Sequence, residues 1–285
     1  FSFVALTLHQ PVLVSCVLDS AGASSVTDGD VDFTSVLDTG TTYILELNDG
    51  SGVIQIVTSW TATTLNTPDD ISGSVTPDVT EYSVRKAATI SDVFGVNNEA
   101  GLAADPDGSQ IADTLFVFDI AGDLQQVQYF DDGSTTGWFD ASFNPADDLA
   151  VAYDRGFYVK RLPGVDIDLV VSGEVKTTAT ASVVGTAWNF NSSVAPVGLT
   201  LGTSGLEAYL TPDPDGSQIG DEVWLPQPDG SFKVCQYFDD GSTTGWFDSS
   251  FNPADDELLE GAFLLYNKGV EKPFKLDVPA FYSSL

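Results

Sequence analysis

The sequence predicts an all-β protein of tandem β-sandwich or barrel-like modules, with a duplicated unit in its carboxyl-terminal part. Three observations predict this class. Strand-forming residues occur in short runs separated by Asp-Gly and Asn-Asp-Gly turns, the pattern of successive hairpins. Lys and Arg together number only 10, so residues that usually cover helices are scarce. The segment 105–148 recurs without a gap as 213–256, 108 residues further on, which indicates a repeated structural unit.

Residues 1–79 are predicted to form an amino-terminal β module that starts with an extended segment, 1–18, interrupted by Pro11. Apolar residues occupy the even positions of this segment: Val4, Leu6, Leu8, Val12, Val14, Cys16 and Leu18. This alternation is typical of strands with one buried face. Such a segment either pairs within its own sheet or adds to a sheet edge of a neighbouring copy. In the second case Val4, Leu6 and Leu8 would form the contact between copies.

Residues 80–178 and 179–285 are predicted to be the two copies of the β unit. In each copy a hairpin begins at Thr114 or Glu222 and turns at 121–123 or 228–230. The stretches that are identical between the copies are mostly loops, whereas the hairpin strands diverge. Because cores tolerate apolar exchange, an unchanged loop indicates a geometric or ligand-binding role.

One of these loops has the spacing of a calcium site. Oxygen-bearing groups stand at alternate positions in both copies, the isoleucines contributing carbonyls: Asp105, Asp107, Ser109, Ile111 and Asp113, then Asp213, Asp215, Ser217, Ile219 and Asp221. Calcium binds roughly six to eight such oxygens, so calcium is the candidate cofactor. The glycine is misplaced for an EF-hand, and the alternative is an Asp-Pro-Asp-Gly turn closed by its own side chains.

Aromatic residues near the acidic loops are candidates for stacking on sugar rings: Trp138, Trp246, Tyr129 and Tyr237. Aromatic residues of a small β domain are equally explained by burial in its core. Catalytic signatures are weaker still. The chain has one histidine, His9, which leaves a histidine-based triad or zinc site without its ligands. We therefore expect no enzyme.

The formal net charge of −32 argues against nucleic acid as a partner, because phosphate binding requires a basic surface. It also disfavours binding to anionic membranes, and no apolar run reaches the roughly 18 residues of a spanning helix. The sequence begins with Phe1 and contains no Met, which predicts removal of a signal peptide and an extracellular location. Outside the cell, Cys16 and Cys235 either pair or remain as buried thiols.

Several motifs resemble one family: YSVRKAATISDVFGVNNEAGL (82–102), GWFD (137–140) and RGFYVKR (155–161) followed by LVVSGEV (169–175). The family comprises uncharacterised secreted β-rich repeat proteins of planctomycete- and verrucomicrobia-type bacteria. The resemblance implies export and a β fold, but no reaction. We therefore expect a secreted structural protein of the bacterial surface or extracellular matrix, which assembles with copies of itself into filaments or a polymer through residues 1–18. The alternative is a surface protein that binds glycans.

Overall fold

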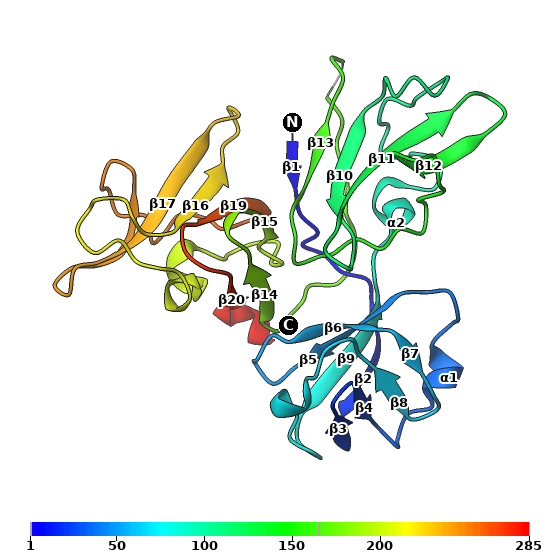
Figure 1. Ribbon diagram of the computed structural model, residues 1–285, viewed down its shortest axis with the longest axis horizontal. Coiled ribbons are helices and arrows are strands. Elements are labelled where there is room, and N and C mark those ends of the chain that lie inside the picture. The colour runs from blue at the N-terminus through cyan, green and yellow to red at the C-terminus, as the bar shows by residue number, and fades with distance from the viewer. Residues whose placement is uncertain (1, 165, 285) are drawn as a thin grey trace.

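The computed structural model describes residues 2–164 and 166–284 of the chain, arranged in three lobes (Figure 1). Strands account for 39% of the structure and helix for 8%, and the sheets are antiparallel, so the predicted all-β class is confirmed. No sheet closes into a barrel within the described residues. None of the helices in these two ranges is long and apolar enough to cross a membrane.

The amino-terminal module contains two four-stranded sheets, with strand orders β2-β9-β5-β6 and β3-β4-β8-β7. Its elements are β2 (Val12–Val17), β3 (Ser20–Gly22), β4 (Ser25–Thr27), α1 (Phe33–Val36), β5 (Tyr43–Leu47), β6 (Ile54–Val57), β7 (Ser59–Trp60), β8 (Thr64–Asn66), η1 (Ser72–Ser74) and β9 (Glu81–Lys86). Apolar residues of both sheets share one core, which includes Val26, Leu45, Leu65 and Tyr82. Because β9 completes the first sheet, this module extends past the predicted boundary at residue 79.

The first copy of the β unit contains one five-stranded sheet with the order β1-β13-β10-β11-β12. Its elements are β1 (Ser2–Val4), α2 (Ile90–Phe94), β10 (Thr114–Phe118), β11 (Leu124–Asp131), β12 (Thr136–Asp140) and β13 (Phe157–Lys160). Helix α2 begins with a capping box, in which the side chains of Thr89 and Asp92 each accept a hydrogen bond from the other's backbone N–H. The indole of buried Trp138 donates a hydrogen bond of 2.8 Å to the Gly95 carbonyl just after this helix.

The second copy has a matching five-stranded sheet, with the order β15-β19-β16-β17-β18, and a separate pair, β14-β20. Its elements are β14 (Thr180–Val184), β15 (Ala187–Ser192), η2 (Leu201–Thr203), η3 (Leu206–Ala208), β16 (Glu222–Pro226), β17 (Phe232–Asp239), β18 (Thr244–Asp248), β19 (Ala262–Asn267), β20 (Lys272–Leu276) and η4 (Ala280–Ser284). Trp246 is buried in this core, as Trp138 is in the first. Unlike Trp138, its indole N–H has no hydrogen-bond partner among the described residues.

The two five-stranded sheets obtain their edge strands from different places. In the first, Phe3 of β1 lies opposite Tyr158 of β13; in the second, Phe190 of β15 lies opposite Leu264 of β19. Strand β15 comes from the chain just before the second sheet. The strand that precedes the first sheet, β9, pairs instead in the amino-terminal module. The edge of the first sheet is therefore filled by β1, which is distant in sequence.

The predicted extended segment 1–18 thus contributes strands to the sheets of two modules. Its first part, β1, joins the sheet of the first copy, and Leu6, only 1% exposed, belongs to that core. Its second part, β2, pairs with β9 in the amino-terminal module, where Val14 and Leu18 are buried. Removal of residues 1–18 would consequently take core residues from both modules.

Candidate functional site

The predicted calcium loops are held together by their own backbone. The Asp105 carboxylate accepts hydrogen bonds from the backbone N–H groups of Asp107, Gly108 and Gln110 at 2.8–3.2 Å. The Asp107 carboxylate accepts one from the N–H of Ser109. The second loop repeats these bonds 108 residues further on, with Asp213 as the central acceptor. This is the Asx-turn arrangement that the sequence left open as the alternative to calcium.

The last acidic residue of each loop has a cationic partner. Asp113 is paired with Arg161 at 2.7 Å and also accepts N–H bonds from Ala103 and Leu162. Asp221 is paired with Lys272. Ile111 and Ile219 are 66% and 59% exposed at the loop surface. Carboxylate oxygens that already accept N–H hydrogen bonds or form ion pairs are poorly placed to converge on a cation. The geometry therefore favours a structural role for the two Asp loops. Calcium binding stays a prediction.

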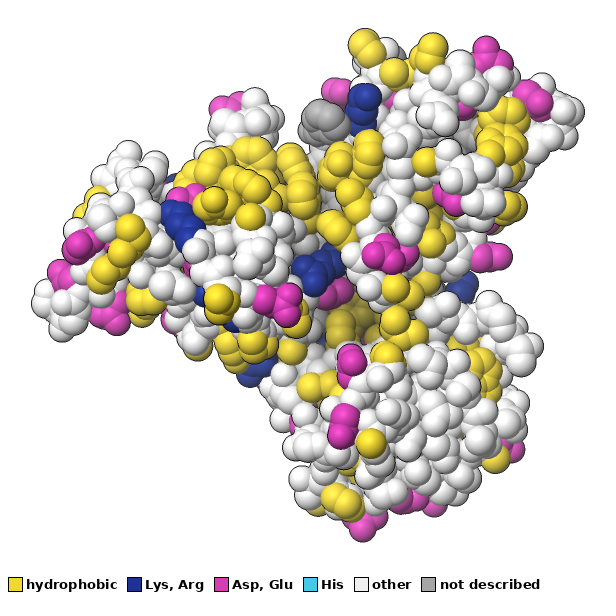
Figure 2. All heavy atoms as spheres, viewed as in Figure 1, with side chains coloured by type: hydrophobic (Ala, Val, Ile, Leu, Met, Phe, Trp, Pro, Cys, Tyr) yellow, Lys and Arg dark blue, Asp and Glu magenta, His cyan; other side chains and the backbone are white. Residues whose placement is uncertain are grey.

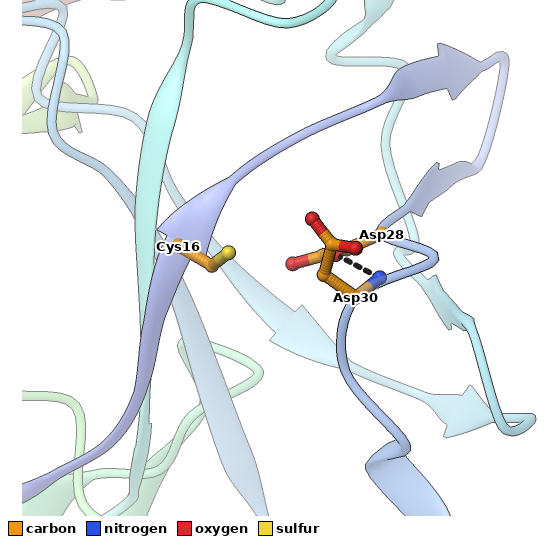
Figure 3. Close-up of side chains that lie close together, drawn as sticks. All are labelled: Cys16, Asp28 and Asp30. Atoms are coloured by element: carbon orange, nitrogen blue, oxygen red, sulfur yellow. Dashed lines mark hydrogen bonds between the residues drawn. The ribbon is translucent and has the colours of Figure 1, made fainter.

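Among the described residues, the one group of three side chains with metal-ligating atoms in reach of one another is Cys16, Asp28 and Asp30. Figure 3 shows Cys16 on β2 and the two acids on the turn after β4, with the sulfur and the carboxylates pointing toward one another. Asp28 is fully buried. Its carboxylate accepts hydrogen bonds from the Tyr82 hydroxyl at 2.7 Å and the Asp30 N–H at 2.8 Å.

These contacts explain the electrostatics of the cluster. A backbone hydrogen bond at Val17 lowers the pKa of Cys16, but burial and the neighbouring Asp28 outweigh it and raise the pKa above its ordinary value. Burial, followed by the bond to Asp28, raises the pKa of Tyr82 far above the usual range. A protonated thiol is a poor metal ligand, so the arrangement is explained by satisfaction of the buried Asp28 carboxylate. Sequence reasoning missed this cluster because Cys16 lies on β2 and the two acids on the turn after β4, and only the tertiary structure brings these segments together.

Of the four aromatic residues predicted to stack on sugars, three are buried. Trp138, Trp246 and Tyr129 are 0%, 1% and 6% exposed. Tyr237 is half-buried and packs edge-on against Trp246 at 5.6 Å. Rings that pack inside a core cannot offer a face to a ligand, so burial in a small β domain explains Trp138, Trp246 and Tyr129.

A different set of aromatic residues lies on the opposite face of the sheets, outside the hydrophobic cores. In the second copy it contains Trp188, Phe190, Trp224, Phe232 and Tyr266. Phe3 of β1 joins it, with ring centroids 5.7 Å from Phe190 and 5.3 Å from Phe232. Figure 2 shows hydrophobic side chains gathered over the region of β15, β16 and β19. We call this surface the outer aromatic face.

The chain between β1 and β2 crosses a buried polar cluster where the modules meet. The His9 backbone exchanges two hydrogen bonds with Glu174. Its ring packs edge-on against Tyr153 at 4.8 Å. The Glu46 carboxylate pairs with Arg85 at 3.0 Å and accepts a hydrogen bond from the Tyr153 hydroxyl at 2.7 Å. All of these side chains except Glu174 are nearly inaccessible to solvent.

Burial sets the protonation states in this cluster. It lowers the pKa of His9 to about 4, assisted by the charge of Arg85. It lowers the pKa of Lys176 to about 8, although Glu46 acts in the opposite direction. The pKa of Glu46 is lowered because Lys176 and Arg85 together outweigh its desolvation. These shifts follow from the burial of the imidazole and the ammonium group and from the positive charges of Arg85 and Lys176 near the Glu46 carboxylate.

A cavity of about 710 Å³ lies beside this cluster, between the three lobes. Ile44 and Ile54 of the amino-terminal module line it, together with Tyr153 and Arg155 of the first copy and Val183 of the second. Figure 2 shows the hollow where the lobes meet. Arg155 is already engaged, by Asp154 at 3.5 Å and by the Val183 carbonyl at 3.0 Å. The cavity therefore presents apolar walls and few free polar groups.

The chain matches no protein-family model, no curated protein and no solved structure. The resemblance to secreted planctomycete-type repeat proteins consequently stays a prediction.

Proposed function

We propose that this chain is a secreted structural protein of a cell surface or extracellular matrix, which assembles with copies of itself by exchange of β1. The observation that carries the proposal is the origin of the edge strand in the first five-stranded sheet. That sheet has no edge strand of its own, since β9 is used elsewhere. It therefore accepts a strand that is distant in sequence, and a second copy offers the same strand.

The cost of releasing β1 is small compared with a full-length strand. Only Ser2, Phe3 and Val4 pair with β13, whereas β15 has six residues in the equivalent position. Short edge ladders open with low free energy. The freed edge of β13 would present unpaired N–H and C=O groups, the kind of edge to which strands of other chains add. An exchanged β1 makes the same contacts as the original, as in domain swapping.

The contacts of residues 5–10 define which part of the segment can move. Leu6 inserts into the core of the first copy, and Leu8 is half-buried. His9 and Gln10 are held in place, the latter by a hydrogen bond of 2.6 Å from Arg85 to its carbonyl. The exchanged segment is therefore residues 2–8, with Val4, Leu6 and Leu8 as its apolar contacts. An extended segment of this length reaches at most about 25 Å, so the exchanging copies must pack with their β13 edges close together.

The charge of −32 opposes such packing at low ionic strength. Salt screens this repulsion, with a Debye length of about 10 Å at 0.1 M. It leaves the main-chain hydrogen bonds and buried apolar contacts of the strand largely unchanged. Assembly should therefore increase with salt and with protein concentration.

The test locks β1 in its own sheet with a disulfide. Ser2 and Val159 are directly opposed in the antiparallel ladder, where Cα separations of roughly 4.5–5.5 Å suit a disulfide. The background variant carries Cys16→Ser and Cys235→Val, because Val127 occupies the position of Cys235 in the first copy. Ser2→Cys with Val159→Cys is then compared, oxidised and reduced, by analytical ultracentrifugation and electron microscopy.

We expect the background variant and the reduced double-cysteine variant to form assemblies in high salt, and the oxidised variant to remain monomeric. Equal assembly of the oxidised and reduced forms would show that β1 exchange is not the mechanism. A background protein that is monomeric at every salt and protein concentration would refute the proposal as a whole.

A further inference from the structure

The outer aromatic face of the second copy has the layout of an open stacking surface. Trp188 of β15, Tyr266 of β19 and Glu222 of β16 form one row across three neighbouring strands, with Tyr266 directly opposite both of the others. Trp188 is 49% exposed. Its ring centroid is 4.6 Å from that of Tyr266 and 5.0 Å from that of Trp224. Neighbouring strands lie about 4.8 Å apart, so this row spans roughly 10 Å, the extent of about two sugar rings.

Polar contacts hold this surface in one arrangement. The Trp224 indole donates a hydrogen bond of 2.7 Å to Glu222. The other carboxylate oxygen of Glu222 is paired with Lys268 at 2.6 Å. Trp224 also packs against Phe232, with centroids 5.8 Å apart. A surface whose rings are fixed before binding loses little conformational entropy when a ligand stacks on it.

The first copy also has aromatic rings on its outer face, where Phe116 and Tyr158 stack with centroids 4.6 Å apart, but it lacks the tryptophans and the Glu222–Lys268 pair of the second copy. By the strand register, Phe116 stands where the second copy has Trp224, and Thr114 stands at the place of Glu222. Lys160 replaces Tyr266. The divergence between the hairpin strands is therefore concentrated on the outer face. The indole–carboxylate–ammonium arrangement is a feature of the second copy alone.

We propose that Trp188, Trp224 and Tyr266 form a binding site for a neutral polysaccharide. Aromatic rings stack on the apolar faces of sugar rings, while the rim groups Glu222 and Lys268 supply an acceptor and a donor for hydroxyls. Charge selects the ligand class. A molecule of net charge −32 repels acidic polysaccharides, whereas a neutral glycan meets no such repulsion. This site does not depend on exchange of β1.

The test uses the full chain with β1 locked by the Ser2–Val159 disulfide, so that self-assembly does not interfere. Neutral cello-, xylo- and mannohexaose are titrated by calorimetry, with polygalacturonate as the anionic comparison. Protection of tryptophan fluorescence from acrylamide provides a second measurement, because Trp188 is far more exposed than the buried Trp138 and Trp246. Trp188→Ala and Trp188→Phe probe the site. Phe251→Ala is the matched control, since it removes a 53% exposed aromatic ring from another part of the same copy.

We expect at least one neutral hexasaccharide to bind and to protect the fluorescence. Trp188→Ala should weaken binding at least tenfold, equivalent to about 1.4 kcal/mol, Trp188→Phe should weaken it less, and Phe251→Ala should leave it unchanged. Unaltered melting temperatures would confirm that each variant is folded. The proposal is refuted if no neutral hexasaccharide binds at millimolar concentration, if only polygalacturonate binds, or if Trp188→Ala binds as tightly as the parent. It is also refuted if, in the chain without the disulfide, Trp188→Ala removes self-association alone, because the face would then be a contact between copies.

Discussion

One part of the acid destabilisation of this protein should come from a single imidazole. His9 is the only histidine of the chain and is 3% exposed. Burial, supported by the positive charges of Arg85 and Lys176, lowers its pKa to about 4, while Glu46 and the Val194 carbonyl act in the opposite direction. In the unfolded chain the pKa of histidine is near 6.5. The unfolded state therefore takes up a proton in a pH range where the folded state does not.

The sign and size of the effect follow from this difference. Between pH 6.5 and pH 4 the unfolded state binds more protons, so the free energy of unfolding falls as the pH falls. With a folded pKa of about 4, the loss between pH 8 and pH 5 is on the order of 2 kcal/mol. The loss should be absent in His9→Phe, which keeps an aromatic ring against Tyr153 and has no proton to gain.

Two measurements check this prediction. The Hε1 proton of the one imidazole should keep a nearly constant NMR chemical shift from pH 8 to pH 5. Denaturant unfolding of the parent and of His9→Phe at both pH values should show a difference in stability that changes by about 2 kcal/mol. Carboxylates remote from His9 titrate equally in both proteins and cancel in the comparison. An imidazole that titrates near pH 6.5, or a stability difference that is constant between the two pH values, would show that His9 is not buried in its neutral form.

Three further predictions concern other buried groups. Glu46→Gln should lower the free energy of unfolding by about 3–5 kcal/mol, because it leaves Arg85 and Lys176 without the carboxylate that neutralises both. Lys176→Met should lower it much less. Equal losses of unfolding free energy in the two variants would contradict this prediction. Trp138→Phe should destabilise the protein by about 1 kcal/mol more than Trp246→Phe, since of these two indoles only that of Trp138 donates a hydrogen bond, to the Gly95 carbonyl. Thermal unfolding of the two variants measures this difference. Asp105→Ala should lower stability by about 1–3 kcal/mol to the same extent with calcium or with chelator, because its carboxylate closes an Asx turn. A loss that appears only when calcium is present would instead support the predicted calcium site.

The segment 1–18 illustrates how far local sequence patterns reach. The alternation of apolar residues predicts extended chain, and β1 and β2 are strands. The pattern contains no signal that the two strands enter different sheets. That outcome depends on β9, which pairs with β2 and β5 and so leaves the edge of β13 open for β1. Pairing partners are decided by competition between distant strands, and a single sequence does not display that competition.

The aromatic residues show the same limit at the level of side chains. Trp138 and Trp188 both lie in strands with alternating patterns, yet one is 0% and the other 49% exposed. Alternation assigns residues to two faces of a sheet, but which face is covered depends on the elements that pack against it. In the first copy α2 and the following loop cover the face that carries Trp138. Three of the residues predicted to stack on sugars, Trp138, Trp246 and Tyr129, lie on covered faces for this reason.

The all-β class and the hairpin turns can be predicted from the sequence, because they depend on alternation and on Gly and Asp at turns. The role of the Asp loops stays open at that stage, because the same residues suit a calcium site and an Asx turn. The tertiary structure alone decided which strand fills the edge of the first sheet and which aromatic face stays open. It also brought Glu46, Arg85 and Lys176 into one buried cluster at the junction of the modules. Each of these outcomes depends on contacts between residues far apart in the chain, whose free energies are set by burial and by competing partners.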